Sequence, residues 1–156
     1  MPLVEWIGTW PGAVLLQRSG TAYLFVSATH ILAVGLLVGG ILPLDLHLAG
    51  LLRGAPLAVI APLLSRSAAV GLGLAIATGL WLFSVKPGEY LHNAAFLCKM
   101  ALLGLALANV VVQHRSRHYR LALAGGPLHR GVRLVACCSA VLWLAVLVAG
   151  RWIGFL

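Results

Sequence analysis

The stretch TAYLFVSATHILAVGLLVGG, residues 21–40, decides the fold. It contains no Asp, Glu, Lys or Arg, and its one imidazole is His30. At a rise of 1.5 Å per residue, about 20 apolar residues in a helix cross the hydrocarbon core of a bilayer. We therefore expect a transmembrane helix here, and the imidazole within it is the main clue to function because polar groups at this depth are costly.

The rest of the chain has the same apolar character. Of its 156 residues, 62% are hydrophobic and only 9% are charged, and the mean hydropathy is +1.03. A soluble domain carries about a quarter charged residues, so this composition indicates an integral membrane protein. The formal net charge is +8. In so apolar a chain, the excess of arginine indicates cytoplasmic ends of spans and anionic lipid rather than a nucleic acid partner.

The hydropathy pattern predicts an all-α integral membrane protein. We expect one domain over residues 1–156, a four-helix transmembrane bundle preceded by a short interfacial helix at about residues 3–19. The four predicted spans cover residues 21–44, 67–85, 94–113 and 134–150. Two neighbouring stretches extend the pattern: LDLHLAGLLR can continue the first helix, and PLAVIAPLLSR can be a helical lead-in near the interface before the second.

Arginines predict the orientation of the bundle. The loop after the third predicted span contains Arg115, Arg117, Arg120, Arg130 and Arg133. Positive residues collect on the cytoplasmic side of membrane proteins, so this loop is expected to be cytoplasmic and both termini to face outward. The expected location is the inner membrane of a bacterium.

Small residues recur every fourth position on two spans. Gly35 and Gly39 form one such pair, and Gly71, Ala75 and Gly79 form a longer stripe. Small residues at this spacing let helix backbones approach closely, so both stripes are expected to pack helices, within this chain or against a partner complex.

Three polar residues are predicted to meet in the outer half of the bundle. His30 lies about 14 Å into the first span and Lys99 about 8 Å into the third, while Arg151 closes the fourth. An imidazole inside a helical bundle can bind haem iron, and the two cations can neutralise the haem propionates. The pattern therefore favours haem b, with Trp81 and Phe96 packed on the porphyrin.

The second iron ligand is less defined by the sequence. His92 can bend inward from the loop before the third span, or the iron can be five-coordinate. The structural alternative is that His30 only hydrogen-bonds a neighbouring helix backbone or a residue such as Ser27 or Asn109.

A second polar cluster is predicted at the cytoplasmic ends of the first and third spans. His47 and His114 leave the membrane on the same side and are candidate ligands of a second haem. The alternative is a positive-inside signal in which Asp45 pairs with an arginine. His30 and His114 differ in depth by about 16 Å, so they are not expected to share one metal.

Three segments resemble an uncharacterised bacterial four-span membrane family that is itself similar to the CopD-like copper-resistance group. They are LLQRSGTAYLFVSATHILAVGLLVGGILPLDLHLAG, NAAFLCKMALLGLALANVVVQH and LWLAVLVAGRWIGFL. The resemblance points to His30, Asp45, Lys99, Asn109, His114 and Arg151 as functional residues. It adds copper as an alternative to haem as the bound cofactor. At His47 and His92 this chain departs from the family pattern.

Three functions follow from these patterns. The first is a small b-type cytochrome, or the haem-bearing subunit of a redox complex, that passes electrons between a quinone and an outer redox protein. The second is a cofactor-free membrane anchor or assembly subunit, docked on other membrane proteins or on a second copy. The third is copper handling. Catalytic motifs such as HExxH and GxSxG are absent from the sequence, so a non-catalytic role is expected.

Overall fold

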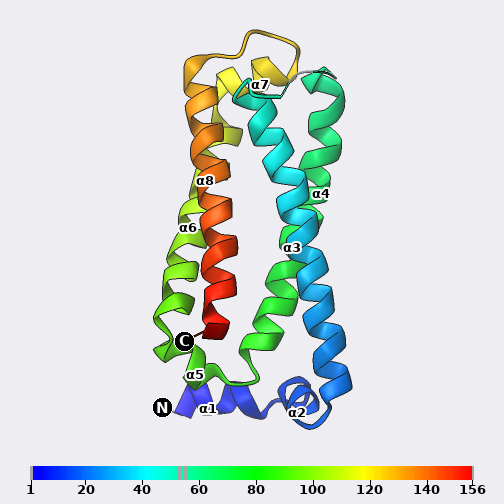
Figure 1. Ribbon diagram of the computed structural model, residues 1–156, viewed down its shortest axis with the longest axis vertical. Helices are drawn as coiled ribbons and strands as arrows, with labels where there is room; N and C mark the ends of the chain where they lie inside the picture. The colour runs from blue at the N-terminus through cyan, green and yellow to red at the C-terminus, as the bar shows by residue number, and fades with distance from the viewer. Residues whose placement is uncertain (1, 53, 55, 156) are drawn as a thin grey trace.

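A computed structural model describes residues 2–52, 54 and 56–155, with side chains from Trp6 onward. Every regular element in this part of the chain is a helix (Figure 1). The four long helices are α3 (Gly20–Leu48), α4 (Leu57–Phe83), α6 (Ala94–Arg115) and α8 (Arg130–Trp152). The short ones are α1 (Pro2–Thr9), α2 (Pro11–Arg18), α5 (Pro87–His92), α7 (Arg117–Leu123) and the 3-10 turn η1 (Ile153–Phe155).

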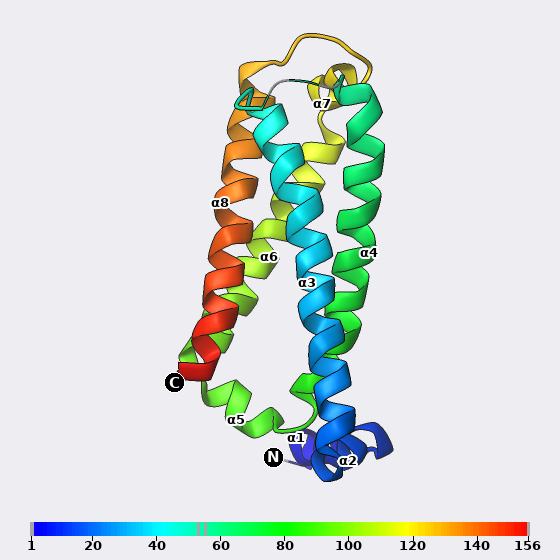
Figure 2. The same cartoon turned by 45° about the vertical axis from the view of Figure 1, so that its right-hand side comes forward.

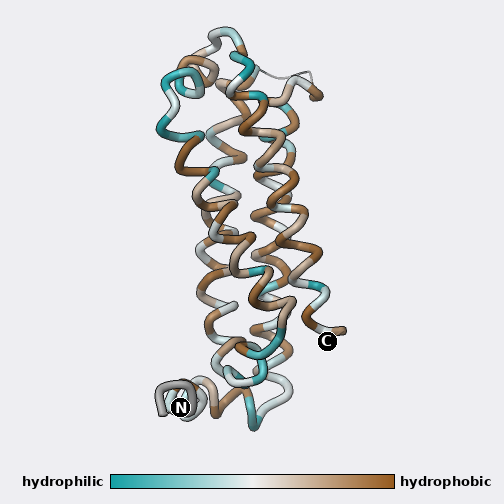
Figure 3. The backbone as a smooth tube through the Cα atoms, turned by 90° about the vertical axis from the view of Figure 1, so that its left-hand side faces the viewer, coloured by the Kyte–Doolittle hydropathy of each residue, from teal (hydrophilic) through white to brown (hydrophobic). Residues whose placement is uncertain are grey.

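The four long helices confirm the predicted membrane spans. Each is long and apolar enough to cross a bilayer, and Figure 3 shows hydrophobic residues along their length with hydrophilic ones gathered mainly near the ends. The protein is thus a multi-pass membrane protein built as a four-helix bundle. Two starts differ from the prediction: α4 begins at Leu57 and α8 at Arg130. The predicted lead-in is part of α4 itself because Pro62, near the start of that helix, removes only one backbone hydrogen bond.

Side-chain caps fix where several helices begin. Ser19 accepts a hydrogen bond from the Ala22 N–H at 3.2 Å at the start of α3. Asn93 does the same for Phe96 at 3.1 Å at the start of α6. Such caps satisfy N–H groups that have no partner within the helix. In place of one predicted interfacial helix the structure has two, α1 and α2. The first ends at Thr9, the backbone of Trp10 is extended, and Pro11 begins the second.

The bundle has two distinct ends. Both termini lie at one end with α1, α2 and α5, and α7 lies at the other (Figure 1). We call the corresponding parts of the bundle the terminal half and the α7 half. Helix α3 packs closely on α4, α6 packs on α8, and α3 joins the two pairs through α8. The pairs lie closer together near α7 and diverge toward the terminal end (Figure 2).

Glycines make the α3–α4 contact close. A Cβ atom at Gly71 would lie 2.4 Å from the Leu37 nitrogen and 2.7 Å from the Ala33 oxygen, both in the backbone of α3. Gly40 of α3 approaches the backbone of α4 equally closely. The predicted stripe on α4 therefore packs helices within the bundle.

The predicted pair on α3 does not pack against another helix of this chain. A Cβ atom at Gly35 or at Gly39 would meet nothing within 4 Å. Both glycines are exposed because they lie on a face of α3 that is turned away from the other helices. The glycine that packs α3 on α4 is Gly40, the residue next to the predicted pair.

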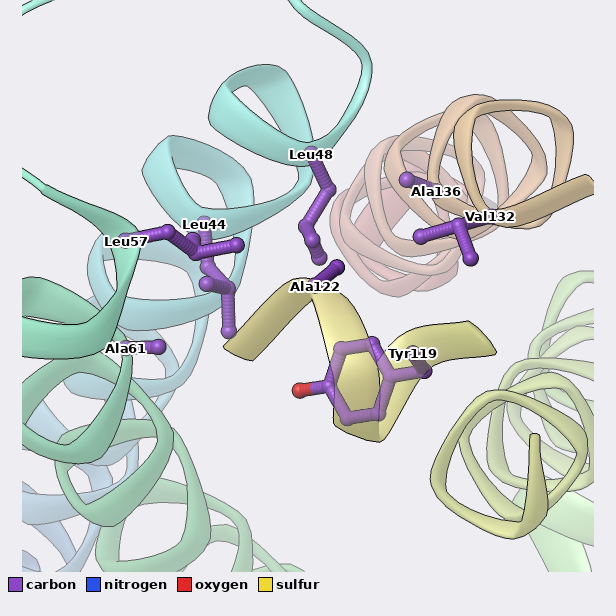
Figure 4. Packing of buried hydrophobic residues seen from close by; sticks show 8 residues of the cluster. All are labelled: Leu44, Leu48, Leu57, Ala61, Tyr119, Ala122, Val132 and Ala136. Carbon is purple, nitrogen blue, oxygen red and sulfur yellow. The ribbon is translucent and has the colours of Figure 1, made fainter. Parts of the chain in front are cut away.

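Both buried apolar clusters lie toward the α7 half and the middle of the bundle. One gathers residues of α3, α4, α7 and α8 around Tyr119 and Ala122 of α7, which close the end of the bundle (Figure 4). The other joins Leu37, Ala68, Ala106 and Trp143 of the four long helices. The clustered buried apolar side chains therefore lie away from the terminal end.

Candidate functional site

In the terminal half, His30 bridges α3 and α4. Its Nδ1 atom lies 2.8 Å from the Thr78 hydroxyl oxygen, and the imidazole packs against Gly79, where a Cβ atom would lie 3.2 Å from Cε1. The predicted structural alternative was a hydrogen bond to a neighbouring helix backbone or to a residue such as Ser27 or Asn109. The structure shows Thr78 instead, which lies on the helix that packs most closely on α3.

The hydrogen bonds of Thr78 fix the tautomer of neutral His30. The Thr78 hydroxyl donates to the Leu74 carbonyl at 2.6 Å. Because a hydroxyl has one hydrogen, it accepts the bond from Nδ1–H of His30. The lone pair is then on Nε2, which is the arrangement that metal-ligating histidines need.

Lys99 is the second predicted residue near this position. Its ammonium group lies in the neighbourhood of the His30 imidazole. The end of its side chain packs against α8, 3.4 Å from where a Cβ atom at Gly150 would lie. The structure thus brings two of the predicted haem residues into one region.

The other four predicted haem residues make contacts elsewhere. The Trp81 N–H donates to the Gly12 carbonyl at 2.9 Å. Phe96 stacks on Phe83, with ring centroids 5.5 Å apart. The exposed residues are Arg151, whose guanidinium lies over the Phe155 ring, and His92, whose Nδ1–H donates to the Gly88 carbonyl.

The three predicted metal ligands do not converge. Within the described residues, no group of three or more His, Cys, Asp or Glu side chains could hold a metal ion. His47 lines an open surface cavity with Arg133 at the α7 end. His114 instead lines a separate cavity inside the bundle. The two histidines of the predicted second haem therefore face different spaces.

The cavity inside the bundle is the most developed site in the described part of the chain. It measures about 180 Å³ and lies in the α7 half between the four long helices and α7. Leu37, Ile41, Leu44 and Leu72 provide much of its apolar wall. Its polar lining comes from all five helices: Asp45, Ser65, Asn109, Gln113, His114, Tyr119, Ser139 and Trp143.

Two buried polar atoms at this cavity have no hydrogen-bond partner among the described residues. They are Oδ2 of Asp45 and Nε1 of Trp143. Asp45 is only 4% exposed and Trp143 only 1%. Leaving such a group unpaired costs about 1–3 kcal/mol, and more when it is charged. A protein keeps these costs at sites where something else supplies the missing bond.

The neighbouring polar groups are better satisfied. Asn109 donates to the Val135 carbonyl of α8 at 3.2 Å, and Nδ1–H of His114 donates to the Val110 carbonyl at 2.9 Å. Burial raises the pKa of Tyr119; the hydrogen bond with Ser65 opposes this shift, and the charge of Asp45 adds to it. Tyr119 is therefore a neutral phenol at physiological pH.

Sequence reasoning identified part of this cavity. Asp45, Asn109 and His114 are among the residues that the family resemblance indicated. Gln113, Ser139, Trp143 and Tyr119 were missed as site residues. The available signal was the four-residue spacing of Asn109 with Gln113 and of Ser139 with Trp143, which places each pair on one helix face.

Comparison with known proteins supports the family and no activity. No curated protein and no solved structure matches the chain. A family model, described as a family of unknown function (DUF6644), matches residues 3–156. The expected membership of an uncharacterised family is thus confirmed, while its likeness to the copper-resistance group stays a prediction. The chain belongs to the DUF6644 family.

Proposed function

We propose that this protein is a membrane-embedded binding protein that holds a small, lipid-soluble molecule in the cavity of the α7 half. The observation that carries the proposal is the pair of buried atoms without partners, Oδ2 of Asp45 and Nε1 of Trp143, at one cavity. A bound molecule would supply both missing hydrogen bonds.

The walls of the cavity support this function. Ligand pockets in proteins are mostly apolar, with a few convergent polar groups that orient the ligand. Leucine, isoleucine and alanine side chains provide the apolar surface here, and the polar groups come from several helices. At about 180 Å³, the space is slightly larger than the engineered cavity of about 150 Å³ that binds benzene. Its size therefore suits a single ring with small substituents.

The cavity also has a route to the lipid. Ala69 of α4 and His114 of α6 both line it, and both are exposed. Helices α4 and α6 each pack mainly on their own partners, α3 and α8, rather than on each other. The side between α4 and α6 is therefore where a lipid-soluble molecule would enter.

A matched pair of variants tests the proposal. Leu72→Trp fills the cavity, whereas Leu74→Trp adds the same bulk at a residue of α4 that is 40% exposed. Purified protein in lipid nanodiscs is titrated with toluene, phenol and benzylamine, and binding is followed by calorimetry. We expect at least one ring compound to bind the unmodified protein and Leu74→Trp but not Leu72→Trp. Failure of all three to bind the unmodified protein would overturn the proposal.

A second candidate function is the haem-bearing electron carrier, and the orientation of His30 favours it. Nε2 of His30 would bind the iron, and Lys99 would neutralise a propionate. The residues present suit these two contacts, and when bound the haem would supply one-electron transfer, with a quinone or an outer redox protein as partner. Trp81, Phe96, Arg151 and His92 are already engaged elsewhere, which makes this the weaker candidate.

An absorbance spectrum of the dithionite-reduced protein, purified from haem-supplemented cells, tests the second candidate. A reduced α-band that is lost in His30→Ala and kept in His92→Ala is the expected result. A spectrum without a band, or a band that survives in His30→Ala, would contradict it. Copper handling and a cofactor-free anchor role remain predictions from the sequence.

A further inference from the structure

We infer that the molecule held in the α7-half cavity is a hydroxylated ring of the phenol or hydroquinone class. This inference rests on the proposed binding function and names its ligand chemistry. It follows from the hydrogen-bonding roles of the two unpaired atoms, their place at one cavity and the aromatic residues that line it.

The two unpaired atoms need hydrogen-bonding partners of opposite kinds. Indole N–H of Trp143 can only donate a hydrogen bond, whereas an ionised Asp45 carboxylate can only accept. A hydroxyl group does both, since it has one hydrogen and two lone pairs. An ammonium group would satisfy Asp45 and leave Trp143 unpaired, and a ketone would do the reverse. A protonated Asp45 would still find an acceptor in the same hydroxyl oxygen.

The two unpaired atoms lie at one cavity and come from α3 and α8, which pack on each other. Ser139 of α8 lies within hydrogen-bonding reach of the Asp45 side chain. Trp143 follows Ser139 by four residues, so both side chains lie on one face of α8. One hydroxyl group in the cavity can serve a donor and an acceptor that line the same space.

The remaining surface favours an aromatic ring behind the hydroxyl. Trp143 and Tyr119 both line the cavity, and leucine, isoleucine and alanine side chains provide the apolar remainder of the wall. Aromatic rings gain from such contacts beyond the area that they bury. A rigid ring also loses less conformational entropy on binding than a flexible chain of the same volume. No Lys or Arg lines the cavity among the described residues, so no charge there favours an anion.

Calorimetry on the full chain in nanodiscs tests this chemistry with phenol, hydroquinone, toluene and benzylamine. We expect phenol or hydroquinone to bind about tenfold more tightly than toluene, the effect of one or two hydrogen bonds. Trp143→Phe should reduce this preference while toluene still binds, which shows that the cavity is intact. Trp152→Phe, an exposed tryptophan on the same helix, should leave the preference unchanged.

The outcomes separate this inference from the function on which it rests. Equal binding of phenol and toluene, or tighter binding of benzylamine, would overturn the hydroxyl-ring assignment and leave the binding function standing. A phenol preference that persists in Trp143→Phe would also overturn it. Absence of binding by every compound would overturn both.

Discussion

The two halves of the bundle differ in whether their polar side chains have hydrogen-bond partners. In the terminal half, Trp10 donates to Ser84, Trp81 donates to Gly12, and Gln17 donates to the Gly8 and Val85 carbonyls. These bonds tie α1 and α2 to the end of α4. In the α7 half the packing is apolar, yet two buried polar atoms at its cavity are left without partners.

This contrast shows why a polar residue in a span is not by itself a site. His30 is the most conspicuous such residue in the sequence, but its Nδ1 atom is satisfied by Thr78. Asp45, close to the end of its helix, looks like a routine interfacial charge. The structure buries it at a cavity with one oxygen unpaired, so the less conspicuous residue marks the stronger site.

The largest expected effect comes from the α3–α4 contact that both halves share. Gly71→Leu forces a side chain against backbone atoms of α3, which cannot move aside without separating the helices. We expect the yield of folded protein to fall severely, at a cost above about 3 kcal/mol. Gly73→Leu is the control, because a Cβ atom there meets nothing within 4 Å. Thermal melting in detergent provides the measurement, and similar melting of the two variants would show the contact to be unimportant.

The next largest effect is a gain in stability, where Gly71→Leu gives a loss. Asp45→Leu removes a buried carboxyl group that has one unpaired oxygen, so we expect the unliganded protein to gain about 1–3 kcal/mol. The same variant should lose the preference for phenol over toluene. Thermal melting and calorimetry measure the two effects, and a destabilised Asp45→Leu protein would indicate that the carboxyl group is a structural residue.

His30→Leu should destabilise the protein, whereas Asp45→Leu should stabilise it. It removes a satisfied hydrogen bond between α3 and α4, and we expect a loss of about 0.5–1.5 kcal/mol. Thr78→Val removes the same bond from the other side, so the double variant should lose less than the sum of the two single variants. A His30→Leu protein that is more stable than the original would contradict the view that polar groups of the terminal half stabilise the fold.

The smallest expected effect is at the terminal end. Trp10→Phe keeps an aromatic ring against Trp81 but removes the hydrogen bond to Ser84. We expect a loss of about 1 kcal/mol or less and unchanged ligand binding in the α7 half. Hydrogen exchange of α2 provides the local readout, and an altered phenol affinity would show that the halves are coupled.

Much of the fold could be predicted from the sequence because composition alone decides which segments enter a bilayer. Residues 21–40 and three similar stretches predicted four helices, and the structure has them. Helix starts were less predictable where an apolar helix extends past the predicted span, as at Leu57. Which face of a helix turns toward the other helices was the hardest to predict, and on α3 it is Gly40 that packs on α4.

The site could be predicted only in part for the same reason. Depth along a span placed Asp45 and His114 at the same end of the bundle, and the structure brings both to one cavity. Depth does not reveal the rotation of a helix about its axis. Depth therefore gives no signal for Ser139 and Trp143, although α8 packs on α3, Ser139 meets Asp45, and both residues line the cavity.

The most direct test of the account is a crystal structure of the protein soaked with 4-bromophenol, with the bromine located by its anomalous scattering. We predict one bromine peak inside the α7-half cavity, with the phenol oxygen within hydrogen-bonding distance of Asp45 Oδ2 and Trp143 Nε1. A bromine peak only outside the cavity, or a phenol whose oxygen points away from both atoms, would contradict the account.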